Sequence, residues 1–245
     1  MQYSEVKERM LSLFNKKKLM DMPMEWGFYN ENDRSINRIG YAVNLTPEII
    51  EKAHQFKVDL LITHHPYMPE LKDECFKMIE VYDMIHVFFH APLDDADFGN
   101  SSSIADALGL INCKKIIPYQ YDYYWGISGE LVERTTYDKL LNELSTILNE
   151  TVKGYKNNDK LIHKVCINAG GGDDINKLKE ALNHQCDVYI TGGYNLDFQL
   201  YAKYRGINLM IGSHTNTELM GIQNFVNLLT SYTDVETTKI DESNY

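Results

Sequence analysis

The sequence predicts an α/β protein of two related domains with mostly parallel sheets, and two observations indicate this. Short apolar runs, such as residues 58–63 and 187–191, alternate with amphipathic segments of helical period. Residues 51–66 are also echoed by residues 179–194: each has an alanine, an aspartate six residues later, three apolar residues, a threonine and a doublet. The alternation is typical of α/β architecture, and the echo indicates a duplicated unit.

A second echo follows in the same order. Residues 85–94 and 207–218 both read as a strand, then a histidine, then a carboxylate. If the chain is duplicated, the strand ends of both halves are expected to face one cleft, with a metal site in it. We expect a first domain at residues 1–120 and a second at residues 121–245, with a polar tail from about residue 232.

Apolar period and capping residues predict the elements in order. Thr46 is expected to be the N-cap of a helix, with Pro47 at the first helical position and Glu48 in the first turn. Strands are expected at residues 36–45, 58–63, 85–90, 116–131 (with a turn), 161–168, 187–191 and 207–212. Helices are expected at residues 1–20, 46–56, 72–84, 101–108, 137–150 and 174–182, then up to residue 204, and at 217–229. Residues 22–35 read as an irregular polar loop.

Composition narrows the class of protein. The 245 residues carry a formal net charge of −11, which repels phosphate backbones and makes nucleic-acid binding a poor expectation. The four cysteines form no C-x-x-C pair, and the N-terminus lacks a signal-like apolar core, so we expect a cytoplasmic protein. No apolar stretch approaches about 18 residues, so no membrane span is expected.

The chemistry-bearing side chains follow the predicted strands directly. His64 and His65 end one strand, His90 and Asp94 follow the next, and residues 214–218 follow a strand of the second half. Ligands of open α/β sheets bind beyond the carboxyl ends of strands. Each segment alone has a bland interpretation: a structural histidine pair, a helix-capping aspartate, a chance H-x-x-x-E on an amphipathic helix. Together they favour a metal site.

The spacing predicts how ligands would be shared. In an extended backbone, which Pro66 favours, His64 and His65 project to opposite sides and would serve two neighbouring ions. His214 and Glu218 share a helical face if the helix begins near His214. With Asp94 these make five nitrogen and oxygen ligands for two ions about 3.5–4 Å apart, the arrangement of two-metal hydrolytic sites. Such ligands suit zinc, iron, manganese, cobalt or nickel alike.

Two other features have structural interpretations beside functional ones. Residues 170–172 form a glycine turn that permits tight backbone geometry; it could cradle a phosphate, but Asp173 and Asp174 would repel one. The tyrosine-rich residues 119–125 could stack on a base, although a sheet edge or subunit interface is the more ordinary role.

These residues resemble the Nif-three-like dinuclear metal family, whose bacterial members are called GTP cyclohydrolase I type 2 homologues. Residues 62–66 match its I-T-H-H-P block, and residues 90–94 match H-T-x-L-D with alanine for threonine. Residues 169–172 match its glycine turn, and residues 212–218 match G-H-x-x-T-E with one inserted serine. The cleft-lining blocks depart from the pattern, most clearly at residues 191–197, which have Gly193 in place of the acidic residue and contain no histidine.

The resemblance implies a short family form without an inserted domain, two divalent transition-metal ions per chain, and assembly into a ring-shaped hexamer. The implied metal ligands are His64, His65, Asp94, His214 and Glu218, and His90 is implied to lie near them as a contact of the ligands or of the substrate. His90 or a nearby carboxylate is expected to act as the catalytic acid or base. The expected function is a metal-dependent hydrolase of a nucleotide or other heterocycle, with GTP ring opening as the substrate that the family label implies. The alternative is a non-catalytic metal-binding scaffold or metal-handling regulator.

Overall fold

A computed structural model describes residues 1–243, and the chain divides into two units. Unit 1 comprises Met1–Ala96 and Ile222–Ser243, and unit 2 comprises Asp97–Gly221. The sequence places the division near residue 120, within the connection between two paired strands of unit 2. The chain also returns to unit 1 at its C-terminal end, which a single boundary in the sequence does not capture.

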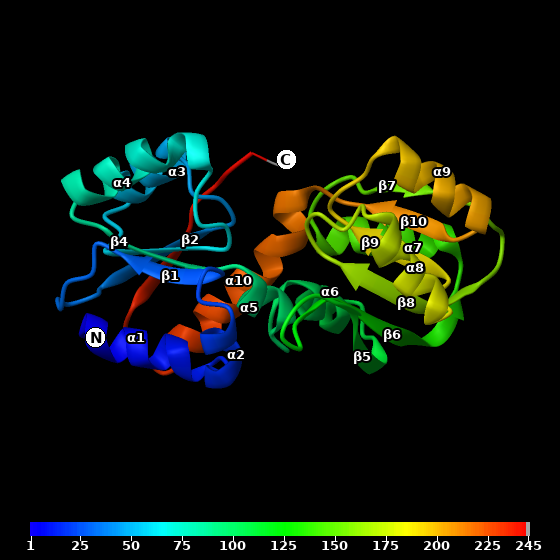
Figure 1. Cartoon of the computed structure of the whole chain (residues 1–245), viewed down its shortest axis with the longest axis horizontal. Helices are drawn as coiled ribbons and strands as arrows, with labels where there is room; N and C mark the ends of the chain where they lie inside the picture. The colour runs from blue at the N-terminus through cyan, green and yellow to red at the C-terminus, as the bar shows by residue number, and fades with distance from the viewer. Residues whose placement is uncertain (244–245) are drawn as a thin grey trace. The chain divides into compact units, whose positions relative to one another are not determined.

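Unit 1 is built on a five-stranded sheet of order β1-β4-β3-β2-β11 (Figure 1). All neighbours pair in parallel except β1, which runs antiparallel to β4. The strands are β1 (Trp26–Tyr29), β2 (Arg38–Ala42), β3 (Leu60–Thr63), β4 (Ile85–Phe89) and β11 (Glu236–Lys239). The helices are α1 (Tyr3–Ser12), α2 (Lys16–Asp21), α3 (Pro47–Gln55), α4 (Lys72–Val81), α5 (Ala91–Asp95) and the later residues of α10 (His214–Thr230), and a 3₁₀ turn spans Pro69–Leu71.

Helices cover both faces of this sheet (Figure 1). On the α3 and α4 face, Ile50 and Ile79 join Leu61 in one buried cluster. On the α1 face, Phe14 stacks on Phe89 at 4.6 Å between ring centroids, and Phe225 contacts both rings. With both faces covered, β3 is buried along its whole length, as its continuous apolar run predicts.

Two segments of unit 1 differ from the sequence expectation. The predicted loop at residues 22–35 contains β1. The sequence does not indicate this strand, because four residues that include a glycine show no readable strand period. A Cβ on Gly27 would lie 2.8 Å from the Phe88 ring, so this residue permits the close approach of β1 to β4. The polar tail contributes β11, which pairs with β2, and Ile240 beyond it is buried.

Unit 2 has a six-stranded sheet of order β5-β6-β8-β9-β10-β7. The central strands β8, β9 and β10 are parallel, and the others pair antiparallel. Its strands are β5 (Ile111–Pro118), β6 (Tyr124–Thr135), β7 (Lys153–Tyr155), β8 (Ile162–Asn168), β9 (Val188–Thr191) and β10 (Asn208–Ile211). Its helices are α6 (Asn100–Ala107), α7 (Tyr137–Ile147), α8 (Ile175–Asn183), α9 (Leu196–Arg205) and the first residues of α10.

Each face of the unit 2 sheet has its own buried cluster. One joins Leu178 of α8 and Phe198 of α9 to Tyr189 of β9. The other joins Ile104 of α6 and Leu140 of α7 to strand residues such as Ile190. Among residues 1–243, no helix combines the length and apolar character needed to cross a membrane.

The two units repeat one chain order. In unit 1 the order β1, β2, α3, β3, α4, β4 forms a parallel triplet flanked beside β4 by antiparallel β1. In unit 2 the order β7, β8, α8, β9, α9, β10 forms the same triplet, flanked beside β10 by antiparallel β7. The sequence echoes therefore fall on equivalent elements, which supports the inferred duplication.

Candidate metal ligands in the two units

The histidine doublet of unit 1 turns both of its rings to the same side. β3 ends at Thr63, and the backbone N–H groups of His64 and His65 both donate to the carbonyl of Val43, at 3.1 and 2.9 Å. The ring centroids are consequently only 4.7 Å apart. The expectation that the rings project to opposite sides is wrong, because the doublet lies in a bend beyond the strand and not in the extended ladder.

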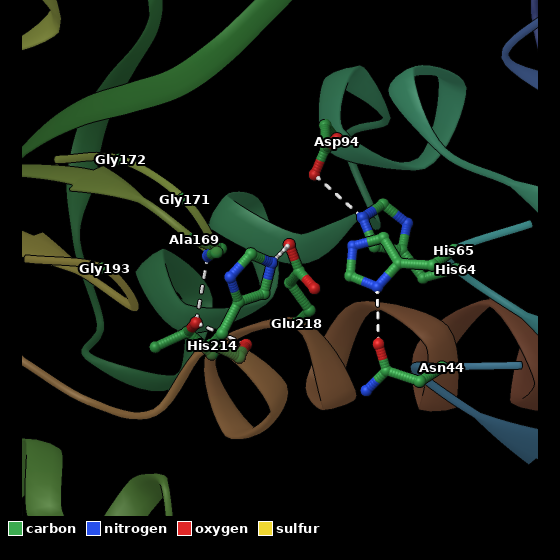
Figure 2. A network of polar contacts seen from close by, with 12 residues as sticks. Asn44, His64, His65, Asp94, Ala169, Gly171, Gly172, Gly193, His214 and Glu218 are labelled. Atoms are coloured by element: carbon green, nitrogen blue, oxygen red, sulfur yellow. Dashed lines mark hydrogen bonds and ion pairs between the residues drawn. The ribbon is translucent and has the colours of Figure 1, made fainter. Parts of the chain in front are cut away.

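Both rings are held through Nδ1. His64 Nδ1 lies 3.0 Å from the carbonyl oxygen of Phe89, and His65 Nδ1 lies 2.8 Å from Asn44 Oδ1 (Figure 2). The amide of Asn44 is oriented by its Nδ2, which donates to Glu242 Oε2 at 2.8 Å. Each Nδ1 therefore faces an acceptor and carries the proton. That tautomer leaves Nε2 as the ring nitrogen able to bind a metal.

Asp94 lies in α5, a short helix with Pro92 near its start. Its Oδ1 is 3.6 Å from His64 Nε2, and its side chain is buried (Figure 2). The structure thus brings together the three ligands that the sequence predicts for unit 1.

His90 joins the unit 1 histidines. Its ring centroid lies 5.0 Å from that of His64 and 5.5 Å from that of His65. One ring nitrogen from each of the three residues lies within 4.8 Å of the others. Glu25 fixes His90 twice, since its Oε2 is 2.6 Å from His90 Nδ1 and its carbonyl accepts from the His90 backbone N–H at 2.8 Å. The hydrogen bond from His90 lowers the pKa of the Glu25 carboxyl.

Sequence reasoning missed Glu25 and Asn44, because both stand far from the histidines in sequence. It also assigned no role to His86. This buried side chain lies 2.9 Å from Thr63 Oγ1, whose hydroxyl donates to the carbonyl of His65 at 2.6 Å. The hydroxyl has one proton, so His86 Nε2–H is the donor to Thr63. Two successive hydrogen bonds, from His86 to Thr63 and from Thr63 to His65, thus stabilise the bend that contains the histidine doublet.

In unit 2, helix α10 begins at His214, as the spacing requires for His214 and Glu218 to share a face. His214 Nε2 lies 3.1 Å from Glu218 Oε1 (Figure 2). The Glu218 carboxylate is almost fully buried, while the His214 side chain is 37% exposed. This pair offers one nitrogen and one carboxylate ligand, as predicted.

A glycine loop after β8 packs closely against the side chains of His214 and Glu218. Gly170 has φ +65°, and a Cβ there would lie 1.9 Å from Glu218 Oε1. Its N–H donates to Thr217 Oγ1 at 3.0 Å, and its carbonyl accepts from Thr191 Oγ1 at 3.1 Å. The glycine turn therefore serves close backbone approach to α10.

The donor set fits a divalent transition metal. Imidazole nitrogens and carboxylate oxygens are common ligands of zinc, iron, cobalt and nickel ions. Metal-ligating histidines generally donate their other ring N–H to an oxygen acceptor, and the unit 1 histidines have that arrangement. The candidate groups are therefore chemically suited to metal in both units.

Comparison with known proteins identifies the family of this chain. The profile of the family described as Duf34/NIF3 (NGG1p interacting factor 3) matches residues 1–244. Relatives described as GTP cyclohydrolase 1 type 2 homolog include one from Buchnera aphidicola, 25% identical over 89% of each chain. Another, from Methanocaldococcus jannaschii, is 24% identical over 85% of this chain and 86% of the relative.

Solved structures share the fold at lower identity. Reduced HcgD from Methanocaldococcus jannaschii aligns with a TM-score of 0.83 and 23% identity, over 99% of this chain and 98% of that chain. A Bacillus cereus protein related to NIF3 aligns with a TM-score of 0.81 and 16% identity, over 99% and 97%. Two α/β units are thus the architecture of these proteins too. With the family profile spanning nearly its whole length, this chain belongs to the DUF34/NIF3 family.

Proposed function

We propose that this protein is a dinuclear metal-dependent hydrolase that acts on a nucleotide or another heterocycle. In this proposal, His64, His65 and Asp94 of unit 1 and His214 and Glu218 of unit 2 serve the same pair of divalent ions. The supporting observation is the paired fixation of His64 and His65 through Nδ1, which prepares both Nε2 atoms for metal.

The two ions would supply Lewis-acid activation of a water molecule for attack on an electrophilic carbon. The Phe89 carbonyl and the Asn44 side chain place the histidine protons on Nδ1, so that Nε2 carries the lone pair that would bind metal. Burial of Asp94 and Glu218 limits competition from bulk water for their carboxylates. The name of the relatives supports GTP as the first substrate to test, with opening of the guanine ring as the reaction. An acid–base role for His90 stays a prediction.

Elemental analysis of protein purified without added metal or chelator tests the metal proposal. We expect about two transition-metal ions per chain, with loss of at least one of them in Glu218→Ala and no loss in His54→Ala. His54 is a matched control because it is exposed in α3 and stacks on Tyr82. A parent protein that neither holds metal nor takes up added zinc, cobalt or manganese would overturn the proposal.

The hydrolase proposal needs a second test. Metal-loaded parent protein is incubated with GTP, and loss of the guanine absorbance and release of formate are followed. Turnover that disappears in Glu218→Ala supports hydrolysis. Metal-loaded protein that leaves GTP and a panel of heterocycles, phosphoesters and amides unchanged would favour the metal-binding scaffold.

The family resemblance also predicts a homo-oligomer, and we propose a ring-shaped hexamer. Light scattering on purified protein gives the mass directly, to be compared with the 28.4 kDa chain. A monomeric mass at all concentrations would contradict this proposal.

A further inference from the structure

We propose that His90 is a third histidine ligand of unit 1, so that His64, His65 and His90 can hold one divalent transition-metal ion without His214 and Glu218. This rests on the proposed metal binding and deepens it, because it adds a ligand and gives unit 1 a site of its own. It also gives His90 a role different from the acid–base role expected from sequence.

The first argument is proximity within one unit. The three residues offer ring nitrogens that lie within 4.8 Å of one another. In a tetrahedral site with metal–nitrogen distances of about 2.0–2.1 Å, the donor nitrogens stand about 3.3 Å apart. Small side-chain rotations therefore suffice to bring three imidazoles onto one ion.

The second argument is that His90 is held in the same way as the two predicted ligands. His64 Nδ1 faces a backbone carbonyl, His65 Nδ1 faces an amide oxygen, and His90 Nδ1 faces the Glu25 carboxylate at 2.6 Å. In all three rings the acceptor places the proton on Nδ1, so Nε2 carries the lone pair that can bind a metal. A carboxylate behind a histidine is a recurrent support of metal ligands, which it orients and makes more basic.

The third argument comes from the internal repeat. His90 precedes α5 directly and stands four residues before Asp94. At the equivalent place in unit 2, His214 begins α10 and stands four residues before Glu218. The repeat thus makes His90 the counterpart of His214, one of the predicted ligands.

Titration of metal-free full-length protein with zinc and cobalt tests the proposal. We expect His90→Ala to weaken binding by at least about tenfold, whereas His54→Ala binds like the parent. We also expect the double variant H214A/E218A to retain about one ion per chain, and that remaining ion to be lost when His90→Ala is added. Circular dichroism and thermal melting of each variant exclude loss of the fold as the cause.

A ligand-exchange variant gives a direct readout. If position 90 coordinates metal, cobalt-loaded His90→Cys shows a thiolate-to-cobalt charge-transfer band that neither the parent nor His54→Cys shows. Parent-like metal affinity in His90→Ala together with no band in His90→Cys overturns the inference and leaves the dinuclear proposal standing. Failure of the parent to bind any metal overturns both.

Discussion

The two units share one topology but place different residues at the end of the middle strand of the triplet. In unit 1, Thr63 ends β3 and the histidine doublet follows. In unit 2, Thr191 ends β9 and Gly192 and Gly193 follow. This strand end therefore carries two histidines in unit 1, whereas in unit 2 its glycines leave space for the start of α10. A Cβ on Gly192 would lie 2.4 Å from Thr217 Oγ1 and 2.8 Å from His214 Cα.

The difference explains how each unit positions its own histidine and carboxylate. Unit 1 holds its rings from behind, with oxygen acceptors on Nδ1. Unit 2 lets the start of α10 sit directly against backbone, because glycine at 170 and 192 leaves space that any side chain would fill. The duplicated units thus share equivalent strands and helices, but the two residues after the middle strand of the triplet have different roles in unit 1 and unit 2.

The largest expected effect comes from filling the space in unit 2. Gly192→Ala would push a methyl group against the backbone of His214, which cannot move without displacing α10. We expect a loss of about 3 kcal/mol in the free energy of unfolding, measured by urea titration. Gly171→Ala is the matched control, since its Cβ would meet only His214 Cε1 at an ordinary 3.6 Å. Equal effects of the two substitutions would contradict this account.

The next prediction concerns a difference between the units in how the free energy of unfolding depends on pH. Burial lowers the pKa of His86 in β4 to about 3, whereas the sheet register makes Leu209, which does not titrate, the equivalent residue in β10. The unfolded chain takes up a proton on His86 near pH 6.5 and the folded chain does not. The stabilising contribution is therefore complete above about pH 6.5 and is lost as the pH falls toward 3.

We expect the parent to lose about 2 kcal/mol of unfolding free energy from this group between about pH 6.5 and pH 5. His86→Asn, which removes the titrating ring but keeps a polar side chain, is expected to lower stability at neutral pH but to flatten this slope. Urea unfolding of both proteins across the interval gives the comparison. Identical slopes would show that His86 is not the group responsible.

The repeat also shows how far sequence reasoning reaches here. The apolar runs and the histidine–carboxylate echo gave the triplets, the equivalent elements and the residues brought together within each unit, because strand ends and helical spacing are local properties. β1 was missed, since a four-residue edge strand with a glycine depends on pairing with β4. Glu25 was missed for the same reason: it precedes β1, and only that pairing brings it to His90.

A smaller effect is expected at the support of His90. In unit 2 the carboxylate that precedes β7 is Glu150, which accepts from the backbone N–H of Ser213 and from Asn216 Nδ2 at the start of α10. Glu25→Gln keeps the shape of the side chain but removes its charge, so the hydrogen bond from His90 Nδ1 weakens. We expect metal affinity to fall about tenfold, measured by zinc titration. Asn44→Ala should act similarly through His65, and Glu31→Gln, on the surface of unit 1, should have no effect.

The smallest expected effect concerns a feature that the units share. The helix after the first strand of each triplet has a side-chain N-cap: Thr46 accepts from Ile49 N–H at 3.3 Å, and Asp174 accepts from Asn176 N–H at 2.6 Å. Replacing either cap by alanine is expected to cost about 1 kcal/mol of unfolding free energy, read from urea midpoints. The Asp174→Ala cost should decline as the salt concentration rises, because salt screens the attraction between the carboxylate and the helix N-terminus. The Thr46→Ala cost should not change. A salt-independent cost at both positions would mean that the two caps act through hydrogen bonding alone, without a contribution from charge at the helix N-terminus.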